Sequence, residues 1–149
     1  VPTYYDEMDI SIPMTKLGHY AAVWGITRWI PSLAESDAIK YGTLSENEKD
    51  IYRAVFYQRT ATETMVDEVK AVKDNANIVK ENGIPQVPML LFISNGSGGT
   101  GFTKERWRSI PKEYISGHDN ASYIELDCPH YVHDYEYEAI SKGIRTFIK

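Results

Sequence analysis

Residues 122–149 read SYIELDCPHYVHDYEYEAISKGIRTFIK, and they predict a strand, a turn and a closing helix in direct succession. Ser122–Leu126 alternates in polarity, which is typical of a short strand. Asp127–His133 then predicts a turn, and Asp134 is well placed to cap a helix. That helix carries one apolar stripe, formed by Ala139, Ile140, Ile144, Phe147 and Ile148.

The predicted turn carries a histidine, His130, between the strand and the helix. A histidine held in this way can act as a general base. Cys128, two residues before His130, is a candidate thiol nucleophile. Side chains at neighbouring positions of a turn usually point in different directions, so we expect Cys128 to pack as an apolar side chain instead. The H-x-x-H pair of His130 and His133 lacks the clustered ligands of a metal site, so no metal is predicted. We expect His133 to orient the loop or to face solvent.

A second strand is predicted at Met89–Ser94, because Pro88–Ile93 is almost uninterruptedly apolar. Such a run is typical of a parallel strand that helices cover on both faces. A helix near Thr103–Ile115, interrupted by Pro111, separates the two strands. The predicted fold class is therefore α/β, with a strand–helix–strand–helix order and a mainly parallel sheet. Two strands alone leave an unpaired edge, so we expect another segment to complete the sheet.

The first eighty or so residues predict helices and no interior strand. Apolar residues recur at helical spacing between Ile10 and Leu33, a segment that ends near Pro31. Two capping boxes follow, Ser45 with Glu48 and Thr60 with Glu63. The helix behind the second box is predicted to run to about residue 81, before Gly83 and Pro85. We therefore divide the chain into a helical region, 1–84, and a C-terminal α/β region, 85–149.

The composition is that of a globular protein, with 42% hydrophobic and 25% charged residues among 149. A net charge of −5 argues against nucleic acid or an anionic membrane as the main partner. The single cysteine excludes a disulfide within the chain. Because the chain begins at Val1 rather than at a methionine, we expect it to be the C-terminal half of a larger protein.

Two stretches resemble the α/β-hydrolase superfamily. IPSLAESDAIKYGTLSENEKDIYRAVFYQRTATETM, residues 30–65, is similar to the helical cap, and ELDCPHYVHDYEYEAISKGIRTFI, residues 125–148, to the end of the core. Both resemble in particular a group of Gram-positive bacterial hydrolases that are often membrane-tethered at the N-terminus. The resemblance implies that 1–84 is a cap or lid and that Pro88–Ser94 and Ser122–Leu126 are the seventh and eighth strands of the core. It also implies an extracytoplasmic location, with the tether in a preceding segment.

Carried over by the resemblance, His130 falls at the position of the catalytic histidine, although Pro129 stands where the superfamily more often has glycine. A serine hydrolase of this type needs a G-x-S-x-G nucleophile elbow, and the chain contains none. The nearest approach is the run Asn95–Gly99, in which Ser97 is separated from the next helix by further loop residues. This run also offers no carboxylate for the acid, and we assign Asp6, Glu7 and Asp9 to the entry of the cap.

The resemblance therefore implies the C-terminal segment of a serine hydrolase, an esterase or related acyl hydrolase that needs no cofactor. Its His130 would serve a nucleophilic serine on a companion N-terminal segment, and its substrate would be a small ester-like molecule. Two alternatives stay open: a non-catalytic binding or regulatory module, and a complete small enzyme built on Ser97, Asp127 and His130. Aromatic residues of the cap are expected to line an apolar pocket: Tyr4, Tyr5, Tyr20, Trp24, Trp29, Phe56 and Tyr57.

Overall fold

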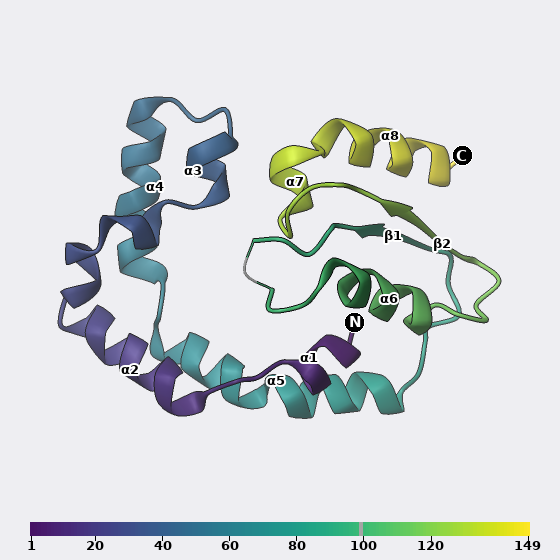
Figure 1. Cartoon of the computed structure of the whole chain (residues 1–149), viewed down its shortest axis with the longest axis horizontal. Helices are drawn as coiled ribbons and strands as arrows, with labels where there is room; N and C mark the ends of the chain where they lie inside the picture. Colours follow the sequence, from purple (N-terminus) through teal and green to yellow (C-terminus); the bar gives the residue numbers. More distant parts are fainter. Residues whose placement is uncertain (99) are drawn as a thin grey trace. The chain divides into compact units, whose positions relative to one another are not determined.

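The structure is a computed structural model, and it describes residues 1–98 and 100–149 (Figure 1). The chain divides into two compact units, one of residues 1–8 with 76–149 and one of residues 9–75. The elements, in chain order, are α1 (Thr3–Glu7), α2 (Ile12–Val23), the 3-10 helices η1 (Ile26–Trp29) and η2 (Pro31–Ala34), α3 (Asp37–Tyr41), α4 (Glu46–Arg59), α5 (Glu63–Glu81), β1 (Met89–Ile93), α6 (Lys104–Tyr114), β2 (Ala121–Glu125), α7 (Val132–Tyr135) and α8 (Tyr137–Phe147).

Helices dominate the described part of the chain, and β1 and β2 form a small parallel sheet with Met89 opposite Ala121 and Ile93 opposite Glu125. The chain is thus of the α/β class, as the apolar and alternating runs predict. Both strands end one residue before the predicted bounds. The division at residue 84, and the assignment of residues 1–84 as a cap, stay predictions.

One edge of β1 has no partner strand among the described residues. The amide of Met89 donates to Asn120 O at 2.9 Å, and the amide of Leu126 donates to Ile93 O at 2.8 Å. Because the backbone alternates direction along a strand, the N–H and C=O groups of Leu90 and Phe92 face the other edge. The unpaired edge expected from the sequence is therefore present.

Helices α6 and α8 cover opposite faces of the sheet (Figure 1). Thr103 caps α6 by accepting from the amide of Arg106 at 3.2 Å, and Ile110 of this helix is fully buried. On the other face, α8 approaches so closely at Gly143 that an added Cβ would lie 2.9 Å from the ring of Phe92. The absent side chain at Gly143 thus sets the distance between α8 and the sheet.

The predicted cap of the closing helix is wrong. Asp134 lies inside the short helix α7, and α8 begins at Tyr137 without a side-chain cap. The chain already forms turn hydrogen bonds before Asp134. The amide of Val132 donates to His130 O at 2.9 Å, and the amide of Asp134 itself donates to Tyr131 O at 3.0 Å. Asp134 instead places a carboxylate oxygen 3.5 Å from Nε2 of His133.

The unit of residues 9–75 confirms one predicted capping box and corrects another. Ser45 and Glu48 form both hydrogen bonds of the box that starts α4. Thr60 does not start α5, because its amide still donates to Phe56 O at the end of α4. The cap is Thr62, whose hydroxyl accepts from the amide of Met65 at 3.3 Å.

The helical segment predicted to end near Pro31 is also corrected, because α2 already ends at Val23. Gly25 has a left-handed φ of 76°, a conformation that ends helices and that glycine adopts without strain. The two 3-10 helices follow it. No helix in the described ranges is both long and apolar enough to cross a membrane.

Candidate functional site

His130 lies on the turn after β2, next to the loop that follows β1. The backbone joins these two segments: the amide of Asn95 donates to Cys128 O at 3.0 Å, and the amide of His130 donates to Ser97 O at 2.9 Å. Both therefore lie at the carboxyl edge of the parallel strands, where open α/β sheets bind ligands. The sequence predicted His130 on the turn between a strand and a helix, and its side chain is exposed there.

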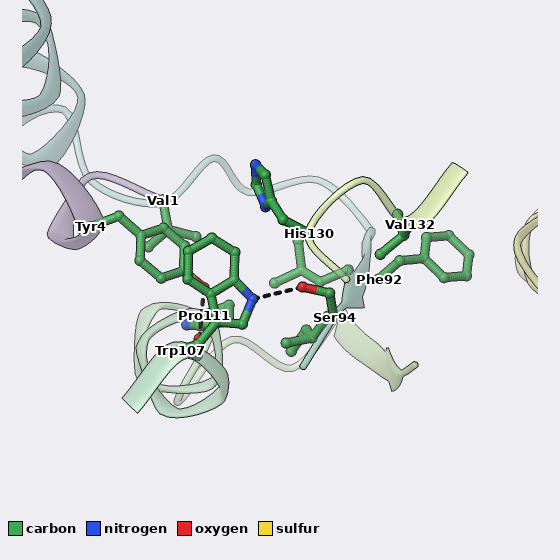
Figure 2. A pocket seen from close by; sticks show the side chains of 10 residues that line it. Val1, Tyr4, Phe92, Ser94, Trp107, Pro111, His130 and Val132 are labelled. Carbon is green, nitrogen blue, oxygen red and sulfur yellow. Dashed lines mark hydrogen bonds between the residues drawn. The ribbon is translucent and has the colours of Figure 1, made fainter. Parts of the chain in front are cut away.

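A cavity of about 400 Å³ lies beside His130. It is lined mainly by apolar and aromatic residues of one compact unit, namely Val1, Tyr4, Tyr5, Met8, Gly98, Thr100, Trp107, His130 and Tyr131. A smaller cavity of about 170 Å³ shares Tyr4, Trp107 and His130 with it and reaches β1 (Figure 2). Volumes of this size suit a small organic molecule.

The indole of Trp107 forms the floor of this site. Its Nε1–H donates to Ser94 Oγ at 2.9 Å, and the ring of His130 is roughly perpendicular to the indole, with centroids 5.0 Å apart (Figure 2). Ser94 is buried at the end of β1 and also accepts from the amide of Gly96 at 3.2 Å. A Cβ on Gly96 would lie 2.6 Å from Trp107 Cγ, so only glycine lets the loop pass over the indole.

Tyr4 lines one side of the site and supplies a hydrogen bond that α6 lacks. Proline has no N–H, so Pro111 leaves the carbonyl of Trp107 without its helical partner. The hydroxyl of Tyr4 donates to that carbonyl at 2.7 Å, and its ring stacks on the indole with centroids 4.3 Å apart. Burial raises the pKa of Tyr4 to about 12, so its hydroxyl stays protonated and can donate at neutral pH.

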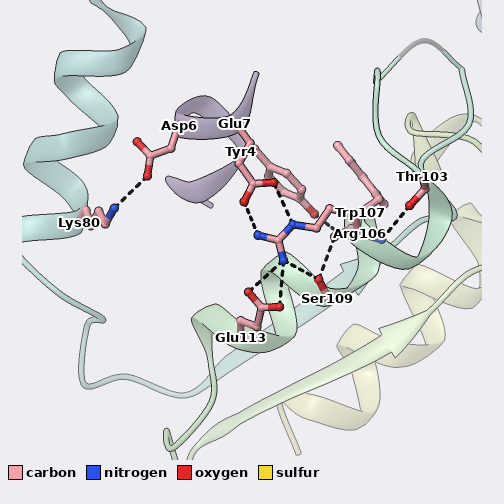
Figure 3. A network of polar contacts seen from close by, with 9 residues as sticks. All are labelled: Tyr4, Asp6, Glu7, Lys80, Thr103, Arg106, Trp107, Ser109 and Glu113. Atoms are coloured by element: carbon pink, nitrogen blue, oxygen red, sulfur yellow. Dashed lines mark hydrogen bonds and ion pairs between the residues drawn. The ribbon is translucent and has the colours of Figure 1, made fainter. Parts of the chain in front are cut away.

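An ion-pair network holds α1 against α6. The guanidinium of Arg106 lies between the carboxylates of Glu7 and Glu113, with Nε 2.9 Å from Glu7 and Nη1 3.0 Å from Glu113 (Figure 3). The hydrogen bond from Arg106 lowers the pKa of Glu7 below its usual value. Lys80, near the end of α5, forms a separate ion pair with α1, 2.9 Å from Asp6. This network fixes the helix that carries Tyr4.

Asp127 and Glu125 contact cations of α6 instead of His130. Asp127 accepts from Lys104 at 2.8 Å and from Asn95 at 3.2 Å, and these hydrogen bonds, the one from Lys104 foremost, lower its pKa. Glu125 pairs with Lys112 and with Arg108, and its pKa is lowered chiefly by the hydrogen bond from Lys112. The structure therefore assigns these two acids to the junction between the sheet and α6.

Ser97 does not contact the imidazole of His130. Its hydroxyl donates to Asn95 Oδ1 at 2.7 Å, which is a local bond within the loop. Within residues 1–98 and 100–149, the ring nitrogens of His130 have no hydrogen-bond partner. The run Asn95–Gly99, the nearest approach to a nucleophile elbow, ends at Gly99, which lies outside the described residues. Ser97, Asp127 and His130 are thus not hydrogen-bonded as a triad.

Cys128 and His133 have the surroundings that the sequence led us to expect. Cys128 is buried, and burial, followed by the charges of Glu136 and Asp127, raises the pKa of its thiol, which disfavours the nucleophilic thiolate. The side chain of His133 is 71% exposed. The described ranges contain no cluster of histidine, cysteine and acidic side chains that could hold a metal ion.

Sequence reasoning missed Trp107 and Ser94. The available signal was the position of Trp107 one turn after the cap Thr103, on the side of the helix that faces the sheet. No protein-family model, curated protein or solved structure matches the chain.

Proposed function

We propose that this chain is the C-terminal segment of a serine hydrolase of the α/β-hydrolase type, in which His130 is the general base. The observation that carries the proposal is the placement of His130: it is exposed at the carboxyl edge of a parallel sheet, at an apolar cavity of about 400 Å³. Its ring nitrogens have no partner in the described part of the chain, so they are available to a hydroxyl.

In the proposed reaction, the nucleophilic serine lies on a companion N-terminal segment. His130 takes the proton of that serine as its oxygen attacks the acyl carbon, and the imidazolium then returns the proton to the leaving alcohol. Water releases the acyl group by the same two transfers. The acid that orients the imidazole belongs to the companion as well, because Asp127 and Glu125 are already paired with α6.

The open edge of β1 supports a companion that adds a strand there. The backbone groups of Leu90 and Phe92 face this edge, and unpaired groups of this kind bind a neighbouring strand. Helix α8 also leaves apolar surface exposed, with Ile144 45% and Phe147 40% accessible. A wider sheet would pair the edge and offer α8 more apolar surface to cover.

The lining of the cavity supports an ester as the proposed substrate class. Tyr4, Trp107 and Met8 are mainly apolar and suit the acyl chain or alcohol of a small ester. The described lining contains no Lys, Arg, Asp or Glu side chain, so the proposal favours an uncharged ester over a phosphorylated or acidic substrate.

The test compares two histidines of one turn in the protein reassembled from this chain and its companion. His130→Ala should lower kcat for a short p-nitrophenyl ester by roughly 10⁴-fold. His133→Ala, at an exposed position on the same turn, should leave kcat within a few-fold. If His133→Ala lowers kcat more than His130→Ala, the choice of base is wrong.

A fluorophosphonate probe tests where the serine lies. Mass spectrometry should find the probe on the companion segment and none on this chain, because the hydroxyl of Ser97 is bonded to Asn95 and not to a base. Labelling of Ser97 would contradict the two-segment proposal and favour the complete small enzyme.

A binding module is the second candidate, and one observation favours it. The cavity is formed within the described residues, whereas no serine or carboxylate there is hydrogen-bonded to His130. A binding module would bind a p-nitrophenyl ester, and the bound ester would quench the fluorescence of Trp107. It would not hydrolyse the ester even when the companion is present.

A further inference from the structure

Helix α2 turns its apolar side outward. Met14, Leu17 and Trp24 share one side of the helix and are 65%, 61% and 77% exposed. The less exposed side carries Ile12, Thr15, His19 and Ala22, and Nδ1 of His19 lies 2.7 Å from Ala61 O. A surface helix of a globular protein normally keeps its large apolar side chains on the covered side.

The two 3-10 helices after α2 continue the exposed apolar surface. Trp29 is 84% exposed, and Ile30 and Leu33 are each 47% exposed. The segment is held to α4, because the hydroxyl of Tyr57 donates to Ile30 O at 3.1 Å. We call residues 12–33 the apolar segment. Exposed apolar surface of this extent marks a site of interaction.

The charge of the apolar segment indicates what it contacts. Lys16 and Arg28 lie within it, and residues 10–34 contain no aspartate or glutamate, in a chain of net charge −5. The next acid along the chain, Glu35, is paired with Arg53 at 2.7 Å. The segment thus combines apolar side chains with positive charge and with two of the three tryptophans of the chain.

We propose that the apolar segment adsorbs to the surface of an anionic phospholipid bilayer. Tryptophan prefers the boundary between water and lipid, and lysine and arginine are attracted to anionic headgroups. A helix of 12 residues is about 18 Å long, shorter than the ~30 Å hydrocarbon core, so α2 lies in the interface and does not span it. This inference needs neither His130 nor a companion segment, so it can fail or hold independently of the proposed hydrolase.

The test is cosedimentation of the 149-residue chain with two kinds of vesicle, one of phosphatidylcholine alone and one containing phosphatidylglycerol as well. Binding should favour the phosphatidylglycerol vesicles, and brominated lipid should quench the tryptophan emission. Each of Trp24→Ala and Trp29→Ala should weaken binding roughly ten-fold, from the loss of a buried aromatic ring. Each of Lys16→Gln and Arg28→Gln should weaken it about five-fold, on phosphatidylglycerol vesicles only.

The matched control is Tyr137→Ala on α8, an aromatic residue that is 59% exposed outside the apolar segment. It should bind like the parent, and circular dichroism should show the same helix content for all variants, because the substituted side chains are exposed. Equal loss in the control variant would overturn the proposal, as would no binding to either vesicle. Self-association that disappears in Trp24→Ala and Trp29→Ala, without vesicle binding, would instead make the segment a protein interface and also overturn it.

Discussion

The contact between α8 and the sheet predicts that one substitution, glycine to alanine, changes stability in opposite directions at two helical positions. At Gly143, a new Cβ would lie 2.9 Å from Cε1 and Cζ of Phe92 and 3.0 Å from Cδ1 of Ile124. At Gly18, inside α2, a new Cβ would meet nothing within 4 Å. Neither glycine needs a positive φ, so alanine fits both backbones.

The magnitudes follow from two competing effects. Alanine in place of a helical glycine gains about 1 kcal/mol in helix propensity. At Gly143 this gain is opposed by overpacking of about 1–3 kcal/mol, since carbon atoms at rest lie about 3.5–4.0 Å apart and both Phe92 and Ile124 must move. Gly143→Ala should therefore destabilise the protein by about 1 kcal/mol, whereas Gly18→Ala should stabilise it by about 1 kcal/mol.

Urea denaturation followed by circular dichroism measures both variants against the parent. The two free energies of unfolding should differ by about 2 kcal/mol, which corresponds to roughly 4–8 °C in Tm for a chain of this size. An unchanged dependence on urea would show that the unfolded state is the same in all three proteins. Equal stabilisation by both substitutions would refute the reasoning, because it would mean that α8 does not pack closely on Phe92 and Ile124.

Two further predictions concern the attachment of α1. Tyr4→Phe should lower the free energy of unfolding by about 1 kcal/mol, because the hydrogen bond to Trp107 O is lost. Tyr5→Phe should be neutral, because the hydroxyl of Tyr5 has no partner in the described structure. An equal effect of both substitutions would contradict the role of Tyr4 as the partner of the Trp107 carbonyl. Glu7→Gln should destabilise the protein at neutral pH, and the difference from the parent should shrink as pH falls through the lowered pKa of Glu7, because a depressed carboxyl pKa stabilises the fold only while the group is ionised. A pH-independent difference in a urea titration series would exclude the ion pair as its source.

The sequence predicted those parts of the fold that depend on local pattern. The apolar run of β1, the box of Ser45 and Glu48 and the stop at Gly83 are each encoded within a few residues, and the structure has all three. The cap at Asp134 failed because the backbone of Tyr131 and Val132 closes the turn first. The end of α2 before Gly25 was not predicted, because the apolar residues keep a helical spacing on both sides of this glycine.

The site was predictable only in part, because its members come from distant positions. His130 stood out as a histidine on a turn between a strand and a helix. The indole of Trp107 reaches Ser94 only when α6 packs on the sheet, and Tyr4 reaches both only when α1 is attached. No local pattern encodes such contacts, since they depend on the tertiary fold.

The hydrogen bond from Tyr4 to the carbonyl of Trp107 has a consequence for the order of folding. The two residues are separated by 103 positions, yet the bond completes a helix that spans only 11 residues. Closing so long a loop costs chain entropy and is slower than forming a helical turn. The C-terminal part of α6, which contains Pro111, therefore becomes fully stable only after the N-terminal residues dock, so this helix is completed late in folding.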